Sequence, residues 1–459
     1  MSVTDNLVRN IPCEKRPIIL QTLQWFLNPV DYLEANIKSF PDIFIAKPLP
    51  IGDGDTLFVI DPKILEYIFT HDRKEFTAPG NLNAIVFEQF VGNNALVTTE
   101  GDIHRQRRQL IMPSFHGERL EAYGILIRRI TEDVMKNLPI NHPFLATEIM
   151  QEISLKVIAQ AVFGIIEGER YQKLIALLKK FTEIFASPFT SSLFFFPSLQ
   201  KDWGNWSPWG KFIRIREEIN NLIYAEINYR RDRPNFKHSD VLSLLMSARY
   251  EDGQAMTEKE LRDELITLLI AGHETTASSM AWALYWLHRT PQVLEKLLAE
   301  LNTLSSTATS MEVFRLPYLT AVCNETLRIC PAAMTTFPRM AQEVVNISGY
   351  TIKPRDIIFG CIYLTHHRED IYPNHEQFIP ERFLERKYSP FQFIPFGGGS
   401  RRCIGEVLAQ FEMKLVIATI LSQHQLMLKE QKPEKLKRRG FGLSPTRGVK
   451  MTVVHQQSV

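Results

Sequence analysis

The chain has 459 residues, of which 45% are hydrophobic and 23% are charged. This is the composition of an ordinary globular protein with ample length for a large core. The formal net charge of +2 gives no case for nucleic acid binding. Five cysteines are present, an odd number, and no two of them form a CxxC pair. This argues against a disulfide framework or a cysteine-rich zinc site, and it suits a reducing cytoplasm.

The N-terminal residues contain no apolar run of the signal-peptide type. They also fall well short of the roughly 20 apolar residues that a membrane-spanning helix needs. We therefore expect a soluble, cytoplasmic protein without a transmembrane anchor, and a peripheral membrane contact stays open. The first elements expected in chain order are a helix after Pro29, short strands around Phe44–Ala46 and Leu57–Ile60, a helix from Asp61, and a polar and aromatic loop over Asn81–Asn94.

Amphipathic helices are expected from there to about Arg289, with one interruption. That connector, residues 185–210, contains three prolines and eight aromatic residues. It is interpreted as a loop packed on the core, as an apolar lid over a pocket, or as a patch that touches lipid.

The longest helix is expected to begin at Thr257, because Thr257 and Glu260 form a capping box. It can continue to Pro291, which makes it roughly 50 Å long at about 1.5 Å per residue. Its apolar residues lie nearly all round, as in a helix that crosses the middle of a core. Strand-like runs return after Pro331, so the sequence predicts a mainly α protein with a minor β region.

The strongest local signal is the segment Phe396–Gly405, in which three glycines and a serine precede Cys403 and a helical run follows it. Glycines allow a flat ligand to approach the backbone. A thiolate at a helix start is stabilised by the helix dipole. An isolated cysteine is most often an inert core residue, but the glycine run has no evident packing purpose of its own. The pattern therefore favours a soft anionic ligand for haem iron.

This segment resembles the haem loop of the cytochrome P-450 family, and Phe396, Gly399, Arg401, Cys403 and Gly405 fill every position of that pattern. The resemblance implies the family's fold with a long central helix over the haem, haem b (iron protoporphyrin IX) as cofactor, and Cys403 as the metal ligand. It extends from about His104 to Gly405. Because haem contacts come from both ends of this span, we expect a single domain over 1–459.

Glu325 and Arg328 lie at i and i+3 on a helix that begins near Pro317. Taken alone, such a pair is usually a surface ion pair of little value. The resemblance adds Arg382 and implies that the three side chains form a buried structural triad below the haem. A buried carboxylate between two arginines is tolerable only as a complete hydrogen-bonded set.

Ala271, Gly272, Glu274 and Thr275 lie midway along the long helix. Ala271 and Gly272 leave room for a ligand, although a close helix–helix contact with a solvated glutamate explains the pattern equally well. The resemblance implies an oxygen-binding groove that Ala271 and Gly272 border on the cofactor side. Glu274 and Thr275 would be an acid–alcohol pair for proton delivery to dioxygen.

His104 and Arg108 lie at i and i+4, so they share one helix face. The resemblance implies that they bind a haem propionate, together with Arg339 and Arg401. Arg105 and Arg107 are expected to point toward solvent. With Arg402, they would form a basic patch for an acidic electron donor.

The resemblance suggests an apolar substrate pocket that contains Phe87, Ile270, Ala271, Ala332, Ala333, Met334 and Phe441. For each of these residues, ordinary core packing is the alternative. We expect a hydrophobic substrate such as a terpene or fatty acid. No flavin, iron–sulfur or NADPH-binding segment fits in the chain, so electrons would come from a ferredoxin with its reductase or from a flavodoxin. The protein is expected to be a monomer.

Two alternatives keep the haem. A peroxide-using or isomerising haem-thiolate enzyme would lack the acid–alcohol pair, and Glu274 and Thr275 argue against it. A non-enzymatic haem sensor would need an output domain, and none is visible. The sequence therefore favours a monooxygenase that inserts one atom of O2 into its substrate.

Overall fold

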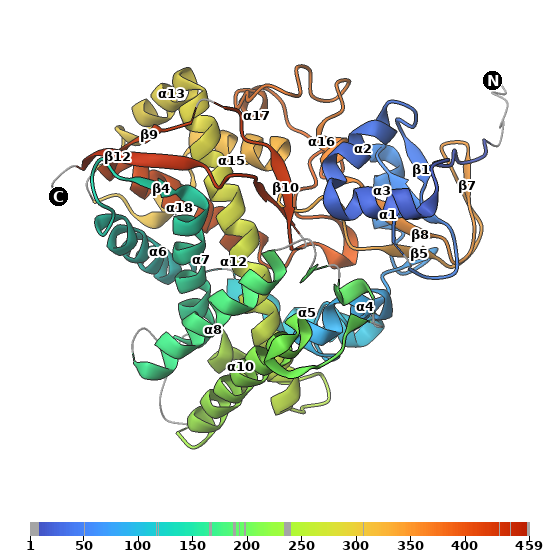
Figure 1. Cartoon of the computed structure of the whole chain (residues 1–459), viewed down its shortest axis with the longest axis horizontal. Helices are drawn as coiled ribbons and strands as arrows, with labels where there is room; N and C mark the ends of the chain where they lie inside the picture. Colours follow the sequence, from blue (N-terminus) through green and yellow to red (C-terminus); the bar gives the residue numbers. More distant parts are fainter. Residues whose placement is uncertain are drawn as a thin grey trace.

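The computed structural model describes residues 9–456, except 50, 116, 118, 165–167, 187–189, 192, 197–198, 234–239, 306, 431 and 441. Helices dominate and the strands form a smaller part (Figure 1), which confirms the predicted class. The helices are α1 (Ile18–Leu27), α2 (Pro29–Ile37), α3 (Pro62–Thr70), α4 (Gly80–Val91), α5 (Gly101–Ile111), α6 (Arg119–Lys136), α7 (Ala146–Phe163), α8 (Glu169–Ala186), α10 (Pro208–Arg231), α11 (Val241–Ser247), α12 (Glu258–Arg289), α13 (Pro291–Leu301), α14 (Ser310–Phe314), α15 (Pro317–Ile329), α16 (Ile362–His366), α17 (Arg382–Glu385) and α18 (Glu406–Gln423). Short 3-10 turns are η1 (Met112–Phe115), η2 (Leu193–Phe195), η4 (Gly204–Trp206) and η5 (Gly399–Arg401).

The strands are β1 (Ile43–Ile45), β2 (Thr56–Val59), β3 (Phe76–Thr77), β4 (Pro143–Leu145), β5 (Arg339–Ala341), β6 (Val345–Ile347), β7 (Tyr350–Ile352), β8 (Ile357–Gly360), β9 (His424–Leu428), β10 (Leu436–Arg439), β11 (Gly442–Pro445) and β12 (Lys450–Gln456). The largest sheet has the order β1-β2-β8-β5-β3. β2 and β8 pair in parallel, with Thr56 opposite Ile357. The sheet therefore joins the N-terminal segment to a segment about three hundred residues later, and the two strands expected near the N-terminus are confirmed.

α12 runs through the middle of the molecule between the helical part and the sheet region (Figure 1). Its capping box is present as predicted: the Glu260 backbone N–H donates to Thr257 Oγ1 at 3.3 Å, and the Thr257 N–H donates to Glu260 Oε2 at 2.8 Å. The helix packs closely on α7 and also contacts α18. It ends at Arg289, two residues before Pro291, which cannot continue it.

The loop expected over Asn81–Asn94 is wrong for most of that range, because α4 occupies Gly80–Val91. The buried side chains Asn83, Val86 and Phe90 recur at helical spacing, and a polar residue at the first of these positions concealed the pattern. The Asn83 amide donates to the Val97 carbonyl at 3.0 Å, which satisfies its burial.

The connector between α8 and α10 is described only in part, since six of its residues lie outside the described ones. Phe194 is buried and stacks near Phe90 of α4, with ring centroids 4.0 Å apart, as expected for a loop packed on the core. Trp203 and Trp206, by contrast, are 68% and 95% exposed. Among the helices that the structure describes, none combines the length and the apolar character needed to cross a membrane.

Candidate active site

The cysteine loop packs directly on the end of α3. Gly397 and Gly399 have φ values of +69° and +62°, where a side chain is strained. A Cβ on Gly398 would lie 2.5 Å from Phe69, and one on Gly399 would lie 2.5 Å from Asp72. The view that the glycines have no packing purpose is therefore wrong: close approach to α3 requires them. The Cys403 N–H donates to the Phe396 carbonyl at 2.9 Å and closes the loop.

Cys403 is surrounded by protein and yet accessible. Its side chain is exposed, and yet burial raises the pKa of its thiol. Both observations hold when protein surrounds a thiol that borders a void. On α12, Ala271 and Thr275 are likewise exposed, although most of the helix around them is buried. They lie at i and i+4, so one face of the helix borders space that protein atoms do not fill.

A cluster of cations lies beside the cysteine loop. Burial, together with the positive charges of Arg401, Arg108, Arg73 and Arg339, lowers the pKa of His104 to about 3. His104 is therefore neutral in this state. The Arg108 guanidinium donates to the Arg402 carbonyl at 2.7 Å. Such a concentration of positive charge needs anions, and the two carboxylates of a haem group would supply them.

Arg401 and Arg339 have different surroundings. Arg401 donates to the carbonyls of Leu96, Ala78 and Thr99, and its Nε is buried without a partner among the described residues. Burial lowers its pKa to about 10. Arg339 is already paired with Asp72 at 2.9 Å and donates to the Gly398 carbonyl at 2.7 Å. Asp72 also accepts from the Ser400 N–H at 2.8 Å. Arg339 thus holds the cysteine loop, and Asp72 is a supporting residue that the sequence analysis missed.

Glu274 and Thr275 do not bond to each other. Thr275 Oγ1 donates to the Ala271 carbonyl at 2.9 Å, while Glu274 Oε1 accepts from Arg439 Nε at 2.9 Å. A Cβ on Gly272 would lie 2.9 Å from Ile158 of α7, and the expected place of Gly272 on the cofactor side stays a prediction. Its missing side chain makes room for a neighbouring helix, as in the helix–helix alternative.

The structure brings Glu325, Arg328 and Arg382 together in the core. Arg328 Nε lies 2.7 Å from Glu325 Oε2, and Arg382 Nε lies 3.2 Å from Glu325 Oε1. Arg328 also donates to the His366 carbonyl at 3.0 Å. The ring Nε2 of His366 accepts from the Ile394 N–H at 2.9 Å, so the carboxylate cluster supports the start of the cysteine loop through His366. Nothing local in the sequence marks His366 for this part.

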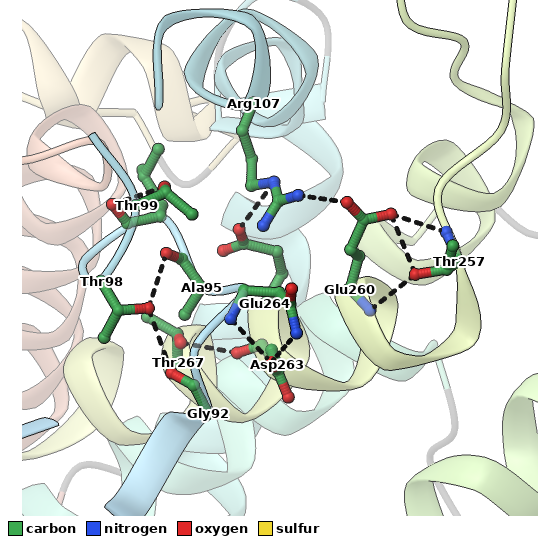
Figure 2. A network of polar contacts seen from close by, with 12 residues as sticks. Gly92, Ala95, Thr98, Thr99, Arg107, Thr257, Glu260, Asp263, Glu264 and Thr267 are labelled. Carbon is green, nitrogen blue, oxygen red and sulfur yellow. Dashed lines mark hydrogen bonds and ion pairs between the residues drawn. The ribbon is translucent and has the colours of Figure 1, made fainter. Parts of the chain in front are cut away.

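Arg107 is not solvent-facing, which corrects its predicted orientation. Figure 2 shows its guanidinium between Glu260 and Glu264 of α12. Arg107 Nη2 lies 2.5 Å from Glu260 Oε1, and Nε lies 3.5 Å from Glu264 Oε1. Helical geometry correctly placed Arg107 on a different face of α5 from His104 and Arg108, but α12 covers that face. Arg105 is exposed as expected, and Arg402 is exposed but paired with Glu406 at 2.6 Å.

The expected pocket residues come from separate segments. The Phe87 ring of α4 meets Phe337, with centroids 5.9 Å apart, so α4 borders the segment between α15 and β5. Ala332 and Ala333 of that segment are half-buried, as is Ile270 on α12. Met334 is buried in an apolar cluster with Trp25 and Leu443, where its surroundings are those of a core residue. Phe441 lies outside the described residues.

Comparison with known proteins gives consistent matches. A family model described as "Cytochrome P450" matches residues 14–452. "Putative cytochrome P450 138" of Mycobacterium tuberculosis (strain ATCC 25618 / H37Rv) is 30% identical over 443 residues, covering 96% of each chain. "Putative cytochrome P450 135B1" of Mycobacterium bovis is 33% identical over 403 residues, covering 88% of this chain and 83% of the relative. The solved structure of retinoic acid-bound cyanobacterial CYP120A1 has a TM-score of 0.85 at 24% identity, covering 98% of this chain and 100% of that one.

Proposed function

Because the chain belongs to the cytochrome P450 family and is a haem-thiolate monooxygenase, an oxidoreductase, we propose that it inserts one oxygen atom of O2 into a hydrophobic small molecule such as a terpene or fatty acid. A hydrophobic substrate is supported by the apolar side chains of the segments expected around the pocket. Ala271 is exposed on the inner face of α12, and Ile270, Ala332, Ala333 and Phe87 are partly exposed. None of them offers a charge to a polar substrate.

The described residues fit a haem. Cys403 would provide the thiolate ligand, and His104, Arg108 and Arg401 would receive the two carboxylates. Arg339 would act beside them mainly by holding the loop through Asp72. We propose haem b, because no two cysteines of the chain are spaced for the covalent attachment of a c-type haem. When bound, the thiolate-ligated iron supplies the activation of dioxygen.

Glu274 and Thr275 are proposed to handle protons on the distal side of the site. Thr275 is exposed on α12, and its hydroxyl is held by the Ala271 carbonyl. A hydroxyl in this position can order a water molecule and pass a proton on. The adjacent carboxylate of Glu274 is half-buried and can exchange protons with solvent. This pair is what separates a monooxygenase from the peroxide-using alternative.

The electrons are proposed to come from a separate ferredoxin with its reductase, or from a flavodoxin. The basic surface expected for docking is smaller than the sequence suggested, since Arg107 is buried and Arg402 is paired with Glu406. Of the three arginines expected in this surface, Arg105 remains exposed. We further propose one monomeric domain in the cytoplasm. The parallel pairing of β2 with β8 joins segments far apart in the chain, and α12 packs on both α7 and α18, which supports one domain.

The test is a reconstitution of the haem-loaded protein with a ferredoxin, its reductase and O2. Retinoic acid, the compound in the CYP120A1 structure, and a long-chain fatty acid are the first substrates to be screened by their shift of the haem spectrum. Product that contains one atom of labelled O2 and depends on the reductase supports the proposal. Product formed only with added peroxide, or isomerised substrate without oxygen uptake, contradicts it.

A further inference from the structure

The carboxylate of Glu274 is bound by a residue from the far end of the chain. Arg439 of β10 donates from Nε to Glu274 Oε1 at 2.9 Å, and the two side chains are 31% and 22% exposed. Gln151 of α7 is the second partner of this arginine. In the amide orientation that satisfies both of its ends, its oxygen accepts from Arg439 Nε and Nη2 at 3.2 Å. Arg439 of β10 therefore contacts side chains from both α12 and α7.

The hairpin of β10 and β11 is attached to α12 at a second point. Ser278 Oγ donates to the Leu443 carbonyl at 2.6 Å. Glu274 and Ser278 lie at i and i+4, so both attachments are on the same face of α12. The hairpin also reaches the segment after α15, because the Leu443 N–H donates to the Ala332 carbonyl at 2.9 Å. A Cβ on Gly442 would lie 2.8 Å from the same carbonyl, so this approach depends on glycine.

The partners of Glu274 decide where its carboxylate points. Thr275 does not hold it, since the threonine hydroxyl donates to the Ala271 carbonyl. His273, the neighbouring titratable group on α12, is buried, and burial lowers its pKa, so it is neutral and offers no charge. Among the residues that the structure describes, Arg439 is therefore the cation paired with Glu274. A partly buried carboxylate that loses such a partner gains rotamer freedom.

We infer that Arg439 is a positioning residue for Glu274, and that the β10–β11 hairpin links the Ala332 segment, expected at the substrate, to the acid that handles protons. The inference rests on the proposed function, because it needs Glu274 to act in proton delivery. It adds a residue that no motif marks. It also implies that the hairpin influences how much product is formed per electron consumed.

The experiment compares Arg439→Gln, Arg439→Lys and Glu274→Gln with Lys437→Gln in the haem-loaded protein. Lys437 is exposed on the same strand, so its variant loses one positive charge without touching Glu274. Each variant is assayed for product and peroxide per electron, and for substrate affinity by the spectral shift. Thermal unfolding of the single variants and of the Arg439→Gln, Glu274→Gln double variant gives a readout that does not depend on activity.

A positioned acid contributes about 10²–10⁴-fold to proton transfer. We therefore expect Arg439→Gln to lower product per electron at least about threefold, with peroxide in its place and substrate affinity within about twofold of wild type. Arg439→Lys restores most of the yield, and Lys437→Gln matches wild type. The double variant is destabilised less than the sum of its two parts, because each substitution removes the same ion pair.

Two results overturn the inference while the proposed function stands. One is a loss of yield in Glu274→Gln but none in Arg439→Gln. The other is additive unfolding effects together with equal losses in Arg439→Gln and Lys437→Gln. If Glu274→Gln keeps full yield, the proposed role of Glu274 fails, and the positioning role of Arg439 fails with it.

Discussion

Arg107 of α5 lies 3.5 Å from Glu264 of α12, measured from Nε to Oε1, and both side chains are buried. A further carboxylate, that of Glu260, also contacts Arg107 in the cluster of Figure 2. α5 also presents His104 and Arg108 toward the cysteine loop. These contacts therefore fix α5, which carries the expected propionate-binding residues, against α12, which carries the acid and the alcohol.

Replacing Arg107 is expected to destabilise the protein strongly. Arg107→Leu leaves Glu264 without its cation in the core. Above the pKa of Glu264, about 8, the carboxylate is charged, and breaking a buried pair in this way costs about 3–5 kcal/mol. Thermal unfolding of the haem-loaded protein measures the effect. Arg105→Leu on the same helix is the matched control, because Arg105 is exposed and loses only a surface contact with Asp102. Equal stability of the two variants would contradict the structure of this cluster.

Glu264 is expected to make stability depend on pH. Burial raises the pKa of Glu264 to about 8, and it outweighs the opposing effect of Arg107. The folded state therefore holds this proton more tightly than the unfolded state does. The contribution is full below the unfolded pKa, near 4.5, and is lost as the pH rises through about 8. Glu264→Gln should flatten the fall in melting temperature between pH 5 and pH 9 that wild type shows. A variant with the same slope as wild type would show that Glu264 does not titrate there.

Cys403 is expected to ligate the haem iron as a thiolate. Carbon monoxide bound to the reduced protein should then give the far red-shifted Soret band of thiolate haem. Cys403→His is expected to lose that band while it retains some haem, since imidazole is also an iron ligand. Cys361→Ser provides the control, because Cys361 is buried elsewhere in the core. An unshifted wild-type spectrum would refute the assignment.

Thr275 is expected to govern the use of electrons. Thr275→Ala removes the exposed hydroxyl that is proposed to pass on protons, so the variant should consume reductant and release peroxide in place of product. Thr275→Ser keeps a hydroxyl and should retain most of the yield. Substrate affinity, measured by the spectral shift, should be similar in both. If product per electron is unchanged in Thr275→Ala, the threonine has no part in proton delivery.

Arg105 is expected to steer the electron donor. Ferredoxins and flavodoxins are acidic, and opposite charges accelerate encounter at low ionic strength. Arg105→Glu should slow partner-driven reduction at low salt and weaken its salt dependence, without change in haem content. Arg355→Glu makes the same charge change in an exposed turn before β8. Identical rates for the two variants would place the docking face elsewhere.

The sequence by itself determined the elements and motifs that depend on near neighbours. The capping box at Thr257, the strands at Ile43–Ile45 and Thr56–Val59, and the segment around Cys403 were all readable, because caps, alternation and glycine spacing act over a few residues. The same holds for the i, i+3 pair of Glu325 and Arg328.

Only the tertiary structure decided what faces each helix. Arg107 was assigned to solvent because a helical wheel gives the direction of a side chain but not the neighbour that covers it. Gly272 leaves room for Ile158 of α7, and nothing local in the sequence distinguishes space for a ligand from space for a helix. The partners that orient the site, Asp72 and Arg439, meet it across 328 and 165 residues of chain. Contacts at that separation follow from how the helices and the hairpin pack, and no local pattern encodes them.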